Sequence, residues 1–140
     1  MRKFSFALLA ALGMISLPAQ ADVDGAKQFV KQYAALVKGA DPSYKLNAES
    51  GRAFFIKKHE VAGKTIACTD CHTDNPLNEG KHAKTGKAIA SLSPAVNPKR
   101  FSNLKKTEEL FDEHCQDVLA RGCTSKEKGD YIMYLLSLSK

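Results

Sequence analysis

The chain has 140 residues, with 21 Lys and Arg against 15 Asp and Glu, so its formal net charge is +6. This excess is small, and no segment interleaves basic and aromatic residues, so we expect no nucleic-acid partner. The length is that of one small globular domain.

The N-terminal residues 1–21 have the pattern of a secretory signal peptide. A short basic end precedes an apolar run over 4–17, and Ala19-Gln20-Ala21 is a small-x-small cleavage motif. The run is shorter than the roughly twenty apolar residues that span a bilayer, which disfavours a membrane anchor. We therefore predict cleavage after Ala21, one mature domain over 22–140 and a periplasmic location.

Two amphipathic helices are predicted before the first cysteine. From Asp24, a candidate N-cap, apolar residues recur at helical spacing until Gly39 and Pro42 end the pattern. A second helical pattern covers 49–59, where Gly51 allows another chain segment to approach closely.

The second half of the chain is predicted as one long loop and two helices. The polar segment over 74–106 has no sustained helical or alternating period, and a loop of this length in a compact domain is usually functional. One helix is predicted from Thr107, as N-cap, to Gly122, which is placed to reverse the chain. The other begins with Thr124 and Glu127 in capping-box spacing. No segment is typical of a strand, so the predicted fold class is all-α.

The segment Cys68-Thr69-Asp70-Cys71-His72 has the C-x-x-C-H spacing that attaches a c-type haem. Two thiols at this spacing can add to the two vinyl groups of the porphyrin, while the next histidine binds the iron. We therefore predict one covalently attached haem c, bonded to Cys68 and Cys71 and ligated by His72. The expected architecture is a single-domain, cytochrome c-like helical haem wrapper whose long loop covers the haem.

Two other kinds of site use similar motifs. Cys68 and Cys71 could bind zinc together with Cys115 and Cys123, or they could form a thioredoxin-like redox pair. The export pattern and the absence of a second C-x-x-C in the sequence disfavour zinc, and the absence of a βαβ pattern disfavours the redox pair.

A haem iron bound by His72 has a sixth position, for which the mature sequence offers His59, His82, His114 and Met133. His82 lies in a polar loop and is predicted to be solvated, and Met133 has the pattern of core filling. His59 and His114 both lie on apolar helical faces, so periodicity alone does not separate them. His114 is favoured because it follows the long loop, which lets the chain cross to the other face of the haem.

Cys115 and Cys123 form a candidate disulfide. They are eight residues apart, which on a continuous helix is too far for a bridge. A bridge therefore requires the helix to end between them, as Arg121-Gly122 permits. Two free thiols are the less favoured alternative in an exported protein.

Three segments, CTDCHTDNP, GKHAKTGKAIASLSPAVNPKRF and DEHCQDVLARGCTSKEKGDYIMYLL, resemble a known family. They are similar to the bis-histidine monohaem c-type cytochromes of the cytochrome c double-prime family and, more distantly, to the sphaeroides haem proteins. In this family the residue directly before the first disulfide cysteine is the distal ligand. The resemblance implies that His72 and His114 are the axial ligands and that Cys115 is bridged to Cys123.

The resemblance also implies a function, which is electron transfer rather than enzymatic catalysis. The distal histidine would leave the iron on reduction and take up a proton, since a free imidazole titrates near neutrality. The emptied site would bind NO or CO, whereas stable O2 binding is less expected with His114 in the distal position. The alternative function is an O2- or NO-binding or NO-detoxifying haem enzyme fed by a dihaem or membrane cytochrome.

Two smaller expectations concern charged residues. Arg100 is a candidate partner for a haem propionate, because a guanidinium fork suits a carboxylate, and a solvated loop charge is an equally favoured interpretation. The expected macromolecular partners are redox proteins, including a dihaem or membrane cytochrome. The mild excess of lysine would suit an acidic one.

Overall fold

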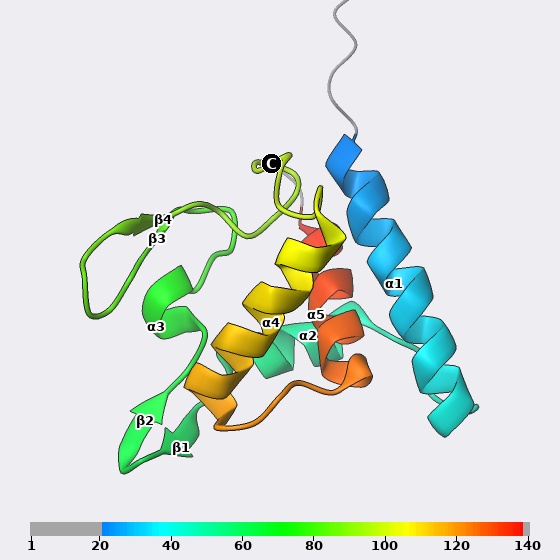
Figure 1. Ribbon diagram of the computed structural model, residues 1–140, viewed down its shortest axis with the longest axis horizontal. Coiled ribbons are helices and arrows are strands. Elements are labelled where there is room, and N and C mark those ends of the chain that lie inside the picture. The colour runs from blue at the N-terminus through cyan, green and yellow to red at the C-terminus, as the bar shows by residue number, and fades with distance from the viewer. Residues whose placement is uncertain (1–20, 139–140) are drawn as a thin grey trace, which may run out of the picture.

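The computed structural model describes residues 21–138, which form helices and two small hairpins (Figure 1). The helices are α1 (Ala21–Ala40), α2 (Ala48–Ile56), α3 (Thr69–His72), α4 (Leu104–Leu119) and α5 (Ser125–Ser137). The antiparallel strand pairs are β1 (His59–Val61) with β2 (Lys64–Ile66), and β3 (Gly80–Lys81) with β4 (Ala88–Ile89). The predicted signal peptide, apart from Ala21, lies outside the described residues. No helix within 21–138 is long and apolar enough to cross a membrane.

Helix α5 is the centre of the hydrophobic core and packs against both α1 and α2 (Figure 1). Its Ile132 and Leu135 are fully buried, as are Phe29 of α1 and Phe55 of α2. Burying each such side chain contributes about 1.5–3 kcal/mol to stability. These three helices therefore form one core together, whereas Leu36 of α1 and Ile56 of α2 are apolar residues that stay exposed.

The contact between α2 and α5 depends on Gly51. A Cβ at this position would lie 1.9 Å from the backbone oxygen of Asp130, so only glycine allows the two helices to come this close. The buried carboxylate of Asp130 accepts hydrogen bonds from the Tyr44 hydroxyl at 2.7 Å and from the Asn47 backbone N–H at 2.8 Å. Since Asn47 is the N-cap of α2, the start of α2 is fixed to α5.

Some predicted helix ends are wrong. Helix α1 extends past Asp24 to Ala21, so Asp24 is not its N-cap. Helix α4 begins after Asn103, whose side chain accepts from the Lys106 N–H, while Thr107 is buried within its first turn. It ends at Leu119, and the residue that caps it in the left-handed conformation is Ala120, with φ 55°, rather than Gly122. The capping box predicted for α5 is confirmed.

The two hairpins were not expected from the sequence. The segment predicted as a helix up to residue 59 ends at Ile56, and His59 begins strand β1. Ala62 and Gly63 connect β1 to β2, both with positive φ, as a tight two-residue hairpin turn requires. Strands of two or three residues are too short to show an alternating pattern.

The long segment over 74–106 is ordered by contacts with its neighbours. The backbone N–H groups of Leu92 and Ser93 both donate to the carbonyl of Pro76, and the Ser93 hydroxyl donates to the Leu135 carbonyl of α5. A Cβ at Gly80 would lie 2.2 Å from the Cys71 carbonyl oxygen, so the backbone of β3 rests directly on α3. The predicted covering loop is therefore a packed part of the fold.

Candidate functional site

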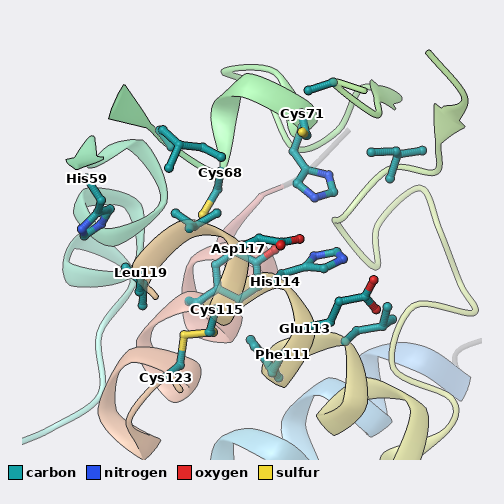
Figure 2. A pocket seen from close by; sticks show the side chains of 18 of the residues that line it. His59, Cys68, Cys71, Phe111, Glu113, His114, Cys115, Asp117, Leu119 and Cys123 are labelled. Carbon is teal, nitrogen blue, oxygen red and sulfur yellow. A yellow bond between two sulfur atoms is a disulfide. The ribbon is translucent and has the colours of Figure 1, made fainter. Parts of the chain in front are cut away.

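A cavity of about 350 Å³ lies between α4 on one side and α3 with the two hairpins on the other (Figure 2). Its apolar lining includes side chains from both hairpins, from α4 and from α5; among them are Val61, Ile66, Ile89, Leu110, Phe111, Val118 and Tyr131. This volume lies within the range of small-molecule and cofactor sites. The cavity is lined by chain segments that are far apart in the sequence.

The imidazoles of His72 and His114 face each other across this cavity. His72 comes from α3 and His114 from α4, and their ring centroids are 5.8 Å apart with an interplanar angle of 35°. Metal–imidazole bonds are about 2.0–2.1 Å long, so two imidazoles on opposite sides of one metal ion stand roughly 6 Å apart between centroids. The pair therefore has the separation that a shared metal centre requires.

Both imidazoles are held in the neutral form that binds a metal. Burial lowers the pKa of His72 to about 4, with smaller contributions from His114 and Arg100. Burial and Arg100 also lower the pKa of His114, although the carboxylates of Glu113 and Asp117 act in the opposite direction. Near pH 7 each ring therefore keeps a lone pair available for coordination.

The thiols of Cys68 and Cys71 line the same cavity. The single turn of α3 is closed by the His72 N–H donating to the Cys68 carbonyl at 3.0 Å, and the Asp70 carboxylate accepts from the Ala67 N–H at 2.9 Å. Burial raises the pKa of the Cys68 thiol to about 11. A redox-active pair of the thioredoxin kind needs a lowered thiol pKa, so the structure disfavours that interpretation.

The zinc alternative is contradicted by the second pair of cysteines. Cys115 and Cys123 form a disulfide with their Cα atoms 5.6 Å apart, so their sulfurs are not available as thiolate ligands. Over residues 21–138, no group of three or more His, Cys, Asp or Glu side chains is arranged to hold a metal ion. A metal between His72 and His114 would therefore need further ligands from a cofactor, as a porphyrin supplies them.

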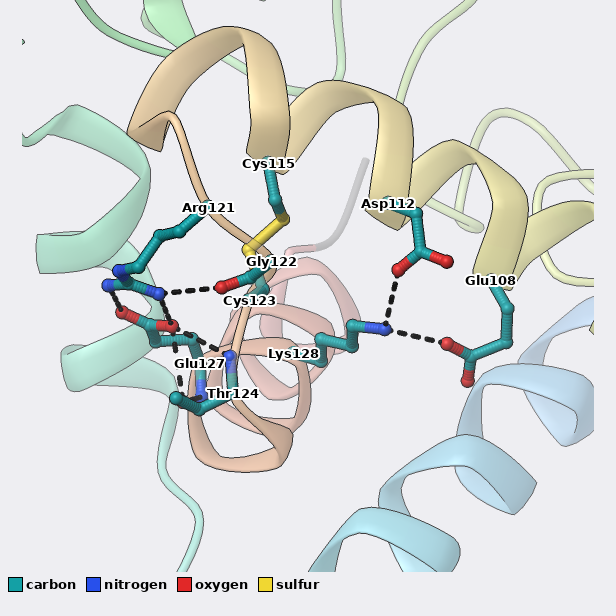
Figure 3. The surroundings of a disulfide bond; sticks show 9 residues. All are labelled: Glu108, Asp112, Cys115, Arg121, Gly122, Cys123, Thr124, Glu127 and Lys128. Atoms are coloured by element: carbon teal, nitrogen blue, oxygen red, sulfur yellow. Dashed lines mark hydrogen bonds and ion pairs between the residues drawn. A yellow bond between two sulfur atoms is a disulfide. The ribbon is translucent and has the colours of Figure 1, made fainter. Parts of the chain in front are cut away.

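The disulfide joins Cys115, the residue after His114 on α4, to Cys123, which lies just before α5 (Figure 3). At the same corner, the Arg121 guanidinium donates to both carboxylate oxygens of Glu127 and to the Gly122 carbonyl. This hydrogen-bonded pair lowers the pKa of Glu127 to about 2, which keeps it ionised as the partner of the Thr124 N-cap. The turn between α4 and α5 is thus held by a covalent bond and an ion pair.

A second set of contacts holds the middle of α4 (Figure 3). The ammonium of Lys128, whose side chain is only 11% exposed, lies 2.8 Å from Glu108 and 3.5 Å from Asp112. The Tyr33 hydroxyl of α1 donates to the same Glu108 carboxylate. Helix α4 is therefore tied to both α1 and α5, and it presents His114 from a rigid support.

Among the four candidates for the sixth position, only His114 faces His72. His59 lies at the other end of the cavity, beside Leu119, as Figure 2 shows. His82 is exposed on the β3–β4 hairpin, where its Nδ1 accepts from the backbone N–H groups of Lys84 and Thr85. Met133 does not line the cavity.

Arg100 is a partly buried cation in the cavity wall. Its Nε is buried and has no hydrogen-bond partner among the described residues, and the same is true of His72 Nδ1. A buried guanidinium nitrogen without an acceptor is costly unless a ligand supplies one. This observation fits a cofactor that carries carboxylates, and the whole donor set fits a haem.

Sequence reasoning missed two acidic residues of the site. Glu113 and Asp117 line the cavity on either side of His114 and counteract the effect of burial on its pKa (Figure 2). Their positions one before and three after His114 on a helix place them beside it, and this spacing was available from the sequence. The buried Tyr131 of α5 also lines the cavity.

Comparisons with known proteins agree with these features. The family described as "Domain of unknown function (DUF1924)" matches residues 42–135. The chain is 40% identical to cytochrome c'' of Methylophilus methylotrophus over 136 residues, which are 95% of this chain and 94% of the relative. It is 37% identical to the cytochrome c-type protein SHP of Cereibacter sphaeroides over 64% of this chain and 69% of that protein.

The fold is also similar to solved structures. The crystal structure of oxidized cytochrome c'' from Methylophilus methylotrophus superposes with a TM-score of 0.80 at 41% identity, covering 85% of this chain and 98% of that one. The structure of oxidized SHP, an oxygen-binding cytochrome c, superposes with a TM-score of 0.68 at 32% identity, covering 79% and 94%.

Proposed function

The chain belongs to the family of c-type cytochromes that includes cytochrome c'' and SHP, and from this we propose that it is a periplasmic monohaem electron-transfer protein. Membership makes it a haem protein with the all-α cytochrome fold. The proposal adds one covalently attached haem c, two histidine ligands and release of one of them on reduction. The predicted signal peptide over 1–21 supports the location outside the inner membrane.

The observation that carries the proposal is the facing pair of imidazoles, 5.8 Å apart. Cys68 and Cys71 would be bonded to the haem, His72 and His114 would be its axial ligands, and Arg100 would pair with a propionate. When bound, the haem supplies an iron that takes up and gives back one electron. The protein's own residues would provide the axial ligands and orient the group.

His114 is the ligand proposed to leave on reduction. Its helix is held by the disulfide at Cys115 and by the Lys128–Glu108 contact, so its ring is positioned by α4, whereas His72 follows the attachment cysteines directly. A released His114 imidazole would take up a proton between Glu113 and Asp117, which favour its charged form. The solution structure of Methylophilus methylotrophus cytochrome c'' was analysed for haem-ligand detachment, and this supports the same behaviour here.

Release of His114 would open a site for NO or CO. On α4 the cavity wall combines the apolar Leu110, Phe111 and Val118 with the carboxylates of Glu113 and Asp117, which accept hydrogen bonds but do not donate them. This suits NO and CO better than O2, whose bound form needs a hydrogen-bond donor. A second candidate function, an O2- or NO-binding haem enzyme fed by a dihaem or membrane cytochrome, is favoured by the relative SHP, an oxygen-binding cytochrome c. Catalytic consumption of NO or O2 with a physiological donor would favour it over electron transfer.

The proposed function is tested by optical and EPR spectra of the purified holoprotein, first ferric and then reduced with dithionite. We expect a low-spin ferric state and a high-spin ferrous state that binds CO. A low-spin spectrum in both states would leave an ordinary electron-transfer cytochrome without ligand release. A high-spin ferric spectrum would contradict ligation by two histidines.

The midpoint potential is expected to rise as the pH falls. Reduction frees His114, and a proton bound to the freed ring stabilises only the reduced form, so below its pKa the potential should rise by about 59 mV per pH unit. Above that pKa the potential should be constant. Burial and Arg100 lower the pKa of His114 from 6.5. A plot of midpoint potential against pH should therefore bend, from sloping to constant, at a pH below 6.5 when the freed ring stays in the cavity.

Protein-film voltammetry between about pH 4 and pH 9 measures this dependence. The variant Glu113→Gln/Asp117→Asn removes the two carboxylates that favour the protonated ring, so it should move the bend to lower pH. The exposed variant Glu49→Gln is a control that should leave the bend in place. A potential that does not change with pH would contradict proton uptake by His114.

A further inference from the structure

Two lysine-bearing segments border the cavity. The β1–β2 segment over 57–66 and the β3–β4 segment over 80–89 each contain three lysines. These six residues are Lys57, Lys58, Lys64, Lys81, Lys84 and Lys87, and all are exposed. Within residues 21–138 none of the six forms an ion pair. Their charges therefore face solvent without a local partner.

The lysines lie at the side of the cavity that carries the attachment cysteines. Lys64 of one hairpin and Lys84 of the other both line the cavity, and α3 with Cys71 comes between the two hairpins in the chain. In Figure 1 both hairpins project to the left, on the side away from α1. A cofactor bonded to Cys68 and Cys71 would have its attached edge between the two hairpins.

Charge is distributed unevenly around this edge. The segment over 80–89 contains no acidic residue, and in 57–66 the single acidic residue, Glu60, accepts a hydrogen bond from Thr65. Between the hairpins lie three acidic residues, Asp70, Asp74 and Glu79, and the first of these is hydrogen-bonded to the Ala67 N–H. The segment over 57–89 therefore contains six lysines and four acidic residues. Across the cavity, α4 contributes Glu113 and Asp117 instead.

We propose that the two hairpins, residues 57–66 and 80–89, form a docking surface for the acidic face of a redox partner protein. The partner would dock over the edge at Cys68 and Cys71, where one electron passes between its redox centre and the haem iron. One centre would be oxidised and the other reduced. When this protein is the acceptor, the proposed release of His114 would break its bond to the iron, and the freed ring would take up a proton. This inference rests on the proposed function in electron transfer and adds the chemistry of the partner and the place where it binds.

The charge pattern favours a protein over an anionic membrane surface. Exposed lysines accelerate encounter and orient the partner more than they add affinity, which suits a complex that must dissociate after each electron. A uniformly negative surface that approached the lysines would also meet Glu113 and Asp117 on the α4 side of the same cavity. A partner with a limited acidic face can avoid that repulsion.

The test is stopped-flow reduction of the ferric holoprotein by three donors. The donors are the anion [Fe(EDTA)]²⁻, the cation [Ru(NH3)6]²⁺ and a small acidic [2Fe–2S] ferredoxin as a protein-sized probe. The hairpin variant is Lys81→Glu/Lys84→Glu/Lys87→Glu. The control variant, Lys31→Glu/Lys38→Glu/Lys45→Glu, makes the same change in net charge at exposed lysines on α1 and just after it.

At about 0.01 M ionic strength, where charges act over about 30 Å, the hairpin variant should react with ferredoxin and [Fe(EDTA)]²⁻ at least about tenfold more slowly than wild type. It should react faster with [Ru(NH3)6]²⁺, and the differences should largely disappear at about 1 M. The control variant should stay within about twofold of wild type with every donor. If the hairpin variant does not fold, the milder Lys81→Gln/Lys84→Gln/Lys87→Gln should give a smaller change in the same direction.

Several results would overturn the proposal. Equal slowing in the hairpin and control variants would show an effect of net charge alone. Slowing with [Fe(EDTA)]²⁻ but not with ferredoxin would show that the surface attracts small anions and does not bind an acidic protein. Lysine-dependent sedimentation with anionic phospholipid vesicles would assign the surface to a membrane. A holoprotein that none of the donors reduces would contradict the proposed electron transfer itself, which separates the two failures.

Discussion

Replacing His114 with alanine is expected to convert the ferric protein from low-spin to high-spin. In the structure His114 is the only one of the candidate side chains that faces His72, at 5.8 Å between ring centroids, and alanine has no donor atom to replace it. Loss of one axial imidazole weakens the ligand field at the iron. The change should be complete in the EPR spectrum, while the ferrous spectra of wild type and variant should be nearly the same.

Three controls make the His114→Ala result specific. His59→Ala and His82→Ala each remove an imidazole that lines the cavity but lies away from His72, and both should remain low-spin when oxidised. Added free imidazole should enter the space left by His114→Ala and restore the low-spin spectrum. A His114→Ala protein that stays low-spin without imidazole would refute the assignment, and combining it with His59→Ala would show whether His59 had become the ligand.

Removing the disulfide by the double substitution Cys115→Ser/Cys123→Ser is expected to lower the free energy of unfolding by about 2.5 kcal/mol. This is the chain-entropy estimate for a loop as short as the one between these two cysteines, whose sequence separation is 8. Both cysteines are replaced together so that no free thiol remains. Chemical denaturation of the ferric holoproteins measures the difference.

The same substitution should also loosen His114, the proposed distal ligand. Cys115 directly follows His114, so its bond to Cys123 fixes the ligand relative to the start of α5. The ferric variant should lose its low-spin spectrum at a lower temperature than wild type. Thr124→Ala is the matched control, because it removes the N-cap of α5 at the same corner for about 1 kcal/mol without touching the bridge. Equal spectral changes in both variants would mean that only overall stability matters.

The candidate attachment site could be recognised from the sequence because its chemistry is local in sequence. The C-x-x-C-H spacing is short enough to be presented by a single helical turn, and α3 holds Cys71 and His72 in this way. The proposed second ligand, His114, is not local in sequence to this motif. His59 and His114 each follow two apolar residues at the same helical spacing, so the sequence pattern does not separate them. Only the path of the segment over 74–106 brings His114 opposite His72.

The helix ends show where tertiary contacts override local preference. Asn103 and Thr107 are both good N-cap residues, and the sequence gives no reason to choose the first. In the structure Thr107 is 6% exposed and lines the cavity, so α4 must start earlier to place it there. At its other end the helix stops at Leu119, with Ala120 as C-cap, because the disulfide requires the chain to turn before Cys123.

The hairpins could not be predicted, because their stability comes from what they touch. Strands β3 and β4 pair only two residues each, and β3 is held where Gly80 lies against Cys71. A two-stranded pair this short is not stable alone. The lysines of this segment were visible in the sequence, but their position beside the cavity depended on the hairpin.

The central place of α5 has a consequence for the order in which the protein can mature. This helix follows the motif at 68–72 in the chain, yet it forms the core contacts of both α1 and α2. During synthesis, α1 and α2 therefore lack their main packing partner until residues 125–137 have been made. We therefore expect Cys68 and Cys71 to remain accessible until α5 has been made, which is the interval in which the proposed haem attachment would take place.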